Sequence, residues 1–249
     1  MSANERTLIN KVNNVIKSIK NNFNNFKEDE PISVSNMNAS SSFIEIRTNM
    51  LNWLSFLCET LKFNIQTFFR SITIFDLYMT KLISKTEIDI DQKELNLITV
   101  ACLSLSTKME EINCNYISFL NEKVLNKPNE KIYTNKDLTK MEFTILKELH
   151  YKLIYSTPFD FLELYIEVFR NLFGNISENF YENLRKISIN LMKNNITNEM
   201  FLNNNYSKYA HICFINALSC LNILEPIIIL RAQKIIFGFN YQYYNKNEK

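Results

Sequence analysis

Glycine and proline are both scarce in this chain. Only two glycines, Gly174 and Gly238, and four prolines occur among its 249 residues. β-Sandwiches, barrels and glycine-rich phosphate-binding loops need such residues for turns and for close backbone approach, so the composition nearly excludes these classes. Hydrophobic residues make up 46% of the chain, which is ample for a core. The composition therefore predicts an all-α protein with short polar loops.

A strong net charge and a long apolar run are also missing. The formal net charge of +2 creates no field of the kind that predicts a nucleic-acid or membrane partner. The run LNILEPIIIL is interrupted by Glu225 and Pro226 and is too short to span a bilayer. The polar start MSANERT does not have the pattern of a secretory signal. We therefore expect a protein of the nucleus, the cytoplasm or both, with neither membrane nor nucleic acid as a partner.

Residues that carry chemistry are few. The only histidines are His150 and His211, and no nucleophile elbow or phosphate-binding loop occurs. His211, Cys213 and Cys220 lack the spacing of zinc ligands and are expected to be packed core residues. The acidic clusters at 28–30 and 110–111 are typical of solvated surface or helix caps. We therefore expect a binding protein with no catalytic residue, no cofactor and no metal. Five cysteines, an odd number in mostly apolar helical pattern, are expected to be reduced core thiols: Cys58, Cys102, Cys114, Cys213 and Cys220.

The stretch Asp91–Glu111 predicts a buried central helix. Large apolar residues and small ones alternate from Leu95 to Leu105, so the middle of the stretch has almost no polar face. Such a helix is normally surrounded by other helices. Asp91 followed by Glu94 has the pattern of a capping box. The last turn becomes charged at Lys108 and the two glutamates after it, which predicts polar contacts at one edge of the fold.

The rest of the chain has the periodicity of further helices. Residues 8–26 predict an amphipathic helix that docks on another element, and residues 27–41 predict a linker. Thr134 with Asp137, and Thr157 with Pro158 and Asp160, predict helix starts. Hydrophobic periodicity predicts the remaining helices at about 42–61, 65–84, 114–125, 135–149, 158–172, 180–191, 209–223 and 226–238.

The order of helix, helix and buried helix occurs twice. The stretch 209–222 repeats the character of 95–107, with alanine, cysteine and serine between large apolar residues. The offset of roughly a hundred residues suggests an internal duplication of an all-α lobe, of which the second copy is short. We predict an N-terminal helix and linker at 1–41, a first lobe at 42–155 and a second lobe at 156–249.

Five segments together resemble a known family. They are RTNMLNWLSFLCETLKF, FDLYMTKLIS, ITVACLSLSTKMEEI, YTNKDLTKMEFTILKELHYKL and TPFDFLELY, and they start at residues 47, 75, 98, 133 and 157. Their order and spacing are those of a cyclin box. The chain resembles a cyclin over about 43–225 and is nearest to the mitotic A/B type. The resemblance implies the cyclin fold, which consists of two tandem helical lobes.

The resemblance also implies a function. Cyclins are non-enzymatic subunits that activate a cyclin-dependent serine/threonine kinase in cell-cycle control. By their positions in the matched motifs, Lys108, Glu111, Glu142 and Phe143 are expected to contact the kinase beside its mobile helix C. A rigid surface that binds only the active position of helix C shifts the kinase toward its active state.

A second implied site is a shallow groove on the first lobe that docks short leucine-containing peptides of substrates or inhibitors. Phe56 stands where the family often has an acidic residue that reads a basic peptide, so a weaker dependence on basic peptide residues is expected. The groove residues implied by the resemblance are Ile46, Arg47, Met50, Trp53, Leu57 and Asn96.

Other functions remain open at the level of the sequence. The chain could be a cyclin-fold factor of transcription, either a partner of a transcriptional kinase or a DNA-contacting factor. A DNA-contacting relative should have a basic face, against which the net charge of +2 argues weakly. A third alternative is a helical scaffold without a kinase partner.

Overall fold

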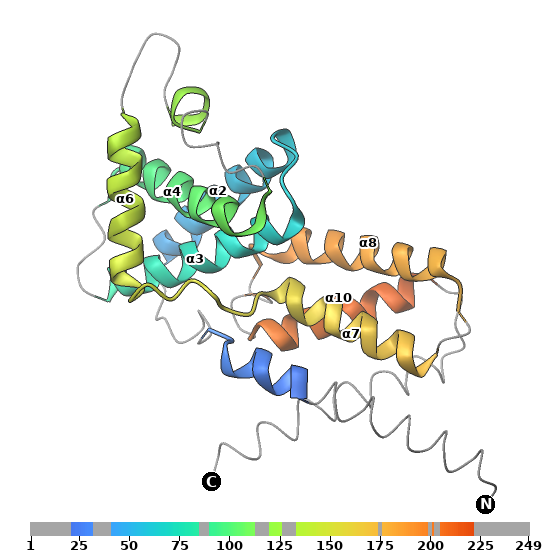
Figure 1. Cartoon of the computed structure of the whole chain (residues 1–249). Coiled ribbons are helices and arrows are strands. Elements are labelled where there is room, and N and C mark those ends of the chain that lie inside the picture. Colours follow the sequence, from blue (N-terminus) through green and yellow to red (C-terminus); the bar gives the residue numbers. More distant parts are fainter. Residues whose placement is uncertain are drawn as a thin grey trace, which may run out of the picture. The chain divides into compact units, whose positions relative to one another are not determined.

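The structure is a computed structural model of the whole chain. It describes residues 21–31, 41–84, 90–112, 120–125, 133–173, 176–198, 201 and 205–221. All regular elements in these ranges are helices, which confirms the all-α fold class. The chain forms two compact units (Figure 1), one of residues 31–155 and one of residues 1–30 together with 156–249.

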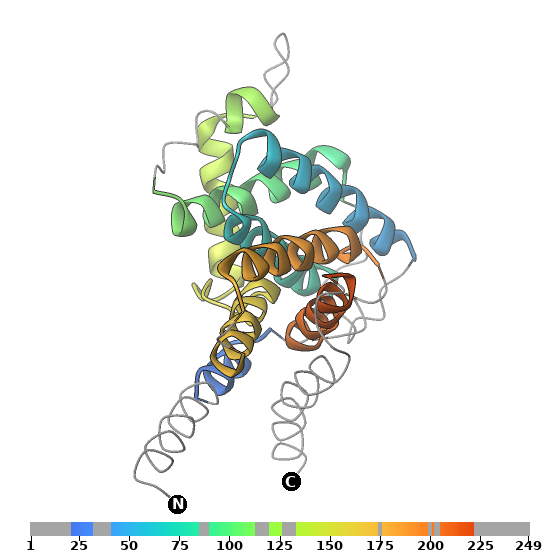
Figure 2. The same ribbon diagram turned by 90° about the vertical axis from the view of Figure 1, so that its right-hand side faces the viewer.

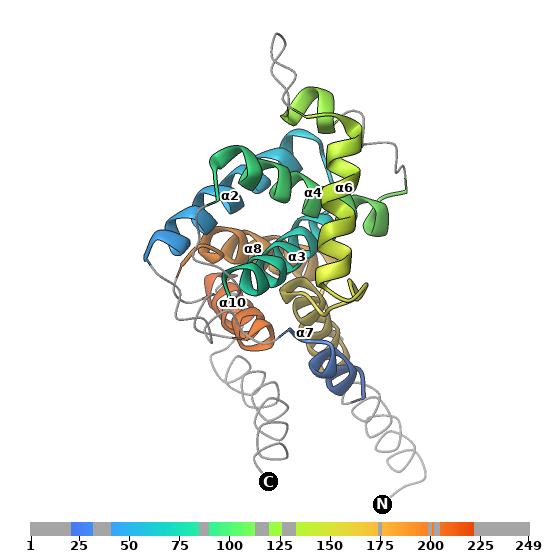
Figure 3. The same ribbon diagram turned by 90° about the vertical axis from the view of Figure 1, so that its left-hand side faces the viewer.

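In the unit of residues 31–155, helices surround one central helix. The central helix is α4 (Gln92–Glu110), and it packs against α2, α3 and α6. Figure 3 shows α6 crossing the direction of α3 and α4 at their ends. The surrounding elements are α2 (Ser41–Thr60), α3 (Ile65–Ile83), the short π-helix η2 (Leu120–Leu125) and α6 (Asn135–Glu148).

Helix α4 is the buried helix that its sequence predicts. The Asp91 side chain accepts a hydrogen bond from the backbone N–H of Glu94 and so caps the start of the helix. Every residue from Leu97 to Thr107 is buried. Ala101 and Cys102 are completely buried, and their small size lets the neighbouring helices approach closely.

The predicted starts of two further helices are confirmed. Thr134 caps α6 and Thr157 caps α7 (Pro158–Leu172). In both cases the carboxylate of the aspartate three residues later accepts a hydrogen bond from the backbone N–H of the threonine. Hydrogen bonds from Thr134 lower the pKa of the Asp137 carboxyl. Pro158 occupies the first helical position of α7, where its missing N–H is not needed.

In the other unit, aromatic rings hold three helices together. Helix α10 (Tyr206–Leu221) packs against α7 and α8 (Glu178–Asn195), as Figure 2 shows from the side. The ring of Phe169 lies at the centre of the cluster. Its centroid is 4.7 Å from that of Phe173 and 6.0–6.2 Å from those of Phe180, Tyr181 and Phe214.

The N-terminal helix docks on this same unit. Residues 21–28 are helical, and the rings of Phe23 and Phe26 lie edge-on to that of Phe161 at 6.0 and 5.9 Å. A carboxylate oxygen of Glu30 accepts a hydrogen bond of 2.7 Å from the backbone N–H of Ser207 at the start of α10. Residues 21–30 therefore belong with 156–221, although the unit of residues 31–155 separates them in sequence.

One expectation about α10 is wrong. The sequence predicts a helix buried all round, but Asn216, Ser219 and Cys220 are exposed. Cys220 is therefore a surface thiol, whereas Cys58, Cys102 and Cys213 are buried in the core as predicted. The predictions for residues 8–20, 114–119 and 226–238, including Cys114 and the length of the second lobe, fall outside the described residues.

Candidate functional site

The last turn of α4 and the middle of α6 form a charged pair. The ammonium of Lys108 donates to both carboxylate oxygens of Glu142, at 2.7 and 2.6 Å. The side chain of Lys108 is 33% exposed and that of Glu142 is 5% exposed. Glu142 is thus buried, although a glutamate on a helix is usually exposed. It lies on the same face of α6 as the buried Leu138 and Ile145, because residues three or four apart share a face of a helix.

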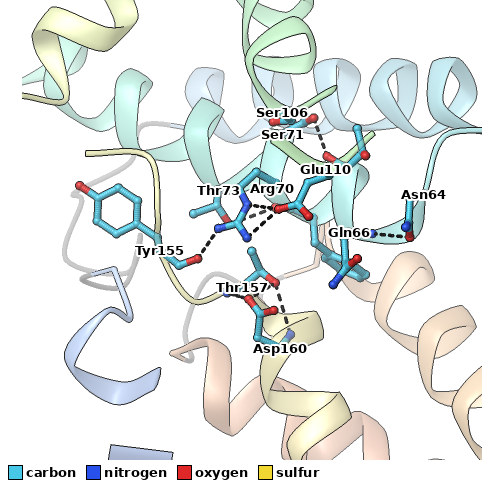
Figure 4. Close-up of polar contacts among 12 residues, drawn as sticks. Asn64, Gln66, Arg70, Ser71, Thr73, Ser106, Glu110, Tyr155, Thr157 and Asp160 are labelled. Atoms are coloured by element: carbon cyan, nitrogen blue, oxygen red, sulfur yellow. Dashed lines mark hydrogen bonds and ion pairs between the residues drawn. The ribbon is translucent and has the colours of Figure 1, made fainter. Parts of the chain in front are cut away.

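The two glutamates that follow Lys108 bind α3 inside the fold. Glu110 pairs with Arg70 at 2.8 Å, and Arg70 also donates to the backbone oxygen of Tyr155 at 2.6 Å (Figure 4). Glu111 accepts hydrogen bonds from the backbone N–H of Asn64 at 2.7 Å and from the hydroxyl of Thr67 at 2.5 Å. Glu111, a predicted kinase contact, therefore satisfies donors at the start of α3.

Exposed apolar side chains flank the Lys108–Glu142 pair in sequence. Phe143, the predicted apolar contact, is 56% exposed, and its ring centroid is 6.4 Å from that of Tyr151. A contiguous patch of such side chains marks an interaction surface, and Phe143 and Tyr151 lie in contact. Among the described residues of the stretch 109–154, the exposed large apolar ones are Met109 at 38%, Ile112 at 99%, Phe143, Tyr151 at 62% and Ile154 at 69%.

Sequence reasoning missed Tyr151 and Ile154. His150 and Tyr151 end α6 in the left-handed region, with φ angles of 52° and 59°. Glycine is the usual residue in such a turn. Because neither position is a glycine, the sequence does not predict the turn here. The sequence still hints at Tyr151 and Ile154, because apolar residues continue beyond Leu149, the buried residue that caps the end of α6.

The residues of the predicted docking groove lie along α2 and the start of α4. Met50 and Leu57 are buried, whereas Ile46, Trp53 and Asn96 are half-buried. The side-chain amide of Gln92 donates to the amide oxygen of Asn96 at 2.9 Å and lies 3.9 Å from the sulfur of Met50. Gln92, which sequence reasoning missed, thus links the two helices at this place. Phe56, one turn after Trp53, is 62% exposed.

Arg47 is not a surface residue of that groove. It is 1% exposed, and its guanidinium donates two hydrogen bonds of 2.8 Å to the carboxylate of Asp76 on α3. A fork-like pair of this kind is the strongest geometry that arginine offers a carboxylate. Arg47 therefore joins α2 to α3 inside the unit.

The described residues contain no group of three or more histidine, cysteine, aspartate or glutamate side chains that could hold a metal ion. Burial raises the pKa of the Cys213 thiol to about 12 and lowers that of His211 to about 4. Burial also raises the pKa of the Cys102 thiol. Within the described ranges, no helix combines the length and apolar character needed to cross a membrane.

Comparison with known proteins points to one family. Residues 18–154 match the family described as cyclin, N-terminal domain. Zebrafish (Danio rerio) G1/S-specific cyclin-E1 is 28% identical over 127 residues, which are 50% of this chain and 28% of that protein. Soybean (Glycine max) G2/mitotic-specific cyclin S13-7 is 28% identical over 122 residues, which are 49% of this chain and 43% of that protein. The matched regions span less than half the length of both relatives.

A solved structure has the same fold. The X-ray structure of a viral cyclin from herpesvirus saimiri matches 90% of this chain and 96% of its own chain, with a TM-score of 0.64 and 16% identity. The cyclin fold is thus confirmed. The expected nearness to the mitotic A/B type is not confirmed, because a G1/S-specific and a G2/mitotic-specific relative are equally identical.

Proposed function

Because the chain belongs to the family of the cyclin N-terminal domain, we propose that it is a cyclin that binds and activates a cyclin-dependent serine/threonine kinase in the cell cycle. It is a regulatory subunit and not itself an enzyme. The observation that carries the proposal is the Lys108–Glu142 pair at the meeting of α4 and α6, with exposed apolar residues following each member of the pair in sequence.

The pair is suited to bind a backbone that presents both donors and acceptors. An ammonium group has three N–H donors, and the Lys108 side chain remains 33% exposed while its ammonium binds the Glu142 carboxylate. The carboxylate still has lone pairs that can accept from a backbone N–H. Because each group fixes the other before binding, little side-chain freedom is lost when a partner helix arrives.

The exposed apolar residues supply the apolar contact area that the charged pair alone cannot provide to a partner. The exposed rings of Phe143 and Tyr151 are in edge-on contact, and aromatic residues are enriched among the anchors of interfaces. A kinase helix C that moves inward brings its glutamate to the phosphate-binding lysine. To shift that equilibrium from 1:99 to 99:1, the surface must favour the inward state by about 5.5 kcal/mol.

The decisive experiment is co-purification of a kinase. We expect the tagged full chain to retain a serine/threonine kinase from the cells that express it naturally, and to raise its activity on a peptide substrate. Lys108→Ala should abolish activation. Lys186→Ala is the matched control, because Lys186 is an exposed lysine on α8. Full activation by folded Lys108→Ala protein, or recovery of no kinase at all, would contradict the proposal.

The identity of the retained kinase also tests the finer proposals. A cell-cycle kinase supports the cell-cycle role, whereas a kinase of transcription would replace it. The mitotic A/B subtype rests on the sequence motifs, and it predicts that the protein accumulates towards mitosis in synchronised cells. Location in the nucleus or the cytoplasm is proposed with it and is checked by imaging the tagged chain in the same cells.

We also propose that α2 and the start of α4 dock leucine-containing peptides. Trp53 is half-buried and Phe56 is exposed, so a peptide would meet an aromatic and not an acidic surface there. Binding should depend little on basic peptide residues and little on salt. Phe56→Glu should make peptide binding depend on basic peptide residues and on salt. If a peptide titration at two ionic strengths shows no such dependence for this variant, the groove is removed from the proposal.

A further inference from the structure

An open hollow lies where the ends of α3 and α6 meet. Its volume is about 800 Å³, which is ample for a ligand group. We name it the α3–α6 hollow. Its lining residues are Lys81, Ser84, Thr144, Lys147, Glu148, His150 and Tyr151.

The lining of this hollow is rich in positive charge and in hydrogen-bond donors. Lys81 is half-buried, and its ammonium is held by the backbone oxygen of Glu148 at 2.9 Å. Lys147 is exposed, and no described residue pairs with it. The lining thus contains two lysines and one acidic residue, Glu148. An ammonium that uses one of three donors on a carbonyl keeps two for a ligand.

We propose that the α3–α6 hollow binds a phosphoryl group carried on a serine or threonine of a peptide. A phosphate monoester has nearly two negative charges and three terminal oxygens, so it can accept from the ammonium groups of Lys81 and Lys147 together. A carboxylate has only one charge to offset theirs. The hydroxyl of Tyr151, on a side chain that is 62% exposed, is a further donor at the rim.

The surroundings favour a peptide over a free anion. Lys140 and Lys136 are exposed and continue from Lys147 along one face of α6, because spacings of seven and four residues return to the same face. These three lysines span about 16 Å along the helix axis at 1.5 Å per residue. An extended peptide with its phosphate in the hollow can place acidic residues along this row.

The hollow shares Tyr151 with the proposed kinase surface but contains neither Lys108 nor Glu142, and its test needs no kinase. The probe is a fluorescent glycine peptide with one central phosphoserine, titrated into the full chain by anisotropy at low salt. We expect binding at least about tenfold tighter than that of the unphosphorylated peptide, since one bond to a charged group has about this effect. Lys147→Gln should weaken binding about tenfold by the same reasoning, while Lys186→Gln on α8 should leave it unchanged.

Three results would overturn the proposal. Equal binding of the phosphorylated and unphosphorylated peptides would exclude a phosphoryl site. Equal loss in Lys147→Gln and Lys186→Gln proteins would show a general response to charge. Binding of inorganic phosphate, measured by calorimetry, without any binding of the phosphoserine peptide would show a small-anion site. Lys147 has no partner among the described residues, so Lys147→Gln protein should fold; Lys147→Glu, which reverses the charge, should eliminate binding as a second variant.

Discussion

The two units of the chain hold their helices together in different ways. In the unit of residues 31–155, ion pairs join helices that are distant in sequence, and side-chain exposure differs strongly among them. In the described part of this unit the pairs are Arg47–Asp76 at 1% and 1% exposure, Arg70–Glu110 at 13% and 15%, and Lys108–Glu142 at 33% and 5%.

The other unit relies on aromatic packing. The rings around Phe169 lie between α7, α8 and α10, and the helix–helix ion pairs there are exposed. Arg185 and Glu163 are 47% and 38% exposed. Lys27–Glu30 is buried, but it lies within one turn of the N-terminal segment and joins no two helices.

This difference separates two kinds of stabilisation. Rings bury much apolar area and tolerate small shifts, whereas a buried ion pair tolerates few alternatives because a misplaced charge is costly. The unit with the buried pairs is also the one that carries the Lys108–Glu142 pair. A surface that must recognise one position of a partner helix benefits from helices whose spacing is fixed in this way.

Breaking the most buried pair should have the largest effect. Asp76→Ala leaves the Arg47 guanidinium inside the unit without its carboxylate. We expect the free energy of unfolding to fall by about 3–5 kcal/mol. Urea unfolding followed by circular dichroism measures this loss.

The matched control for this prediction removes both charges. Arg47→Met combined with Asp76→Leu should restore much of the stability, because replacing a whole buried pair by apolar residues is often neutral. If the double variant is as unstable as Asp76→Ala alone, the loss comes from packing and not from the stranded charge.

Acid should first destabilise the unit of residues 1–30 and 156–249, which we call the aromatic unit. His211 is 7% exposed, its Nε2 has no hydrogen-bond partner in the described part of the chain, and its pKa is lowered from 6.5 to about 4 by burial. Because its folded-state pKa is depressed, the unfolded chain binds the proton more readily. Stability should therefore fall as the pH drops from 6.5 to about 4, by roughly 3 kcal/mol in total.

The variant His211→Gln isolates this contribution from the carboxylates that titrate in the same range. Its stability should change less between pH 7 and pH 4 than that of the wild type, in urea titrations at each pH. Parallel pH profiles of the two proteins would rule out His211 as the cause.

Local signals made most of the fold predictable. Asp91, Thr134 and Thr157 mark helix starts through contacts within three residues, and hydrophobic periodicity marks the buried faces. Such information is contained in short windows of sequence. The charged end of α4 was also predictable from the sequence, but the residues that pair with it were not.

Contacts across long sequence separations were not predictable. Arg47 and Asp76 are 29 residues apart, and neither segment alone predicts that they pair. Arg47 was therefore assigned to the peptide-docking groove. Glu142 was expected on the surface because a glutamate is usually exposed. Its burial follows from Lys108, which α4 brings to it from 34 residues away.

The Lys108–Glu142 pair should respond asymmetrically, because its partners differ in exposure. Lys108→Ala leaves the buried carboxylate of Glu142 unpaired, which costs about 1–3 kcal/mol. Glu142→Ala leaves an ammonium that water can reach, so the loss should be smaller. Urea midpoints of the two variants test this order, and equal midpoints would contradict it. Both variants must be shown to be folded before kinase activation is compared.

The exposed pair of the aromatic unit should matter least. The Nε of Arg185 lies 2.5 Å from a carboxylate oxygen of Glu163, and the guanidinium also lies 5.4 Å from the ring centroid of Phe159. Arg185→Ala removes both contacts, so a double-mutant cycle with Glu163→Ala is needed to isolate the pair. We expect a coupling of about 0.2–1 kcal/mol that shrinks at high salt, since water and ions screen exposed charges. A coupling as large as that between Arg47 and Asp76 would show that burial does not decide the strength of these pairs, and the contrast between the two units would then rest on packing alone.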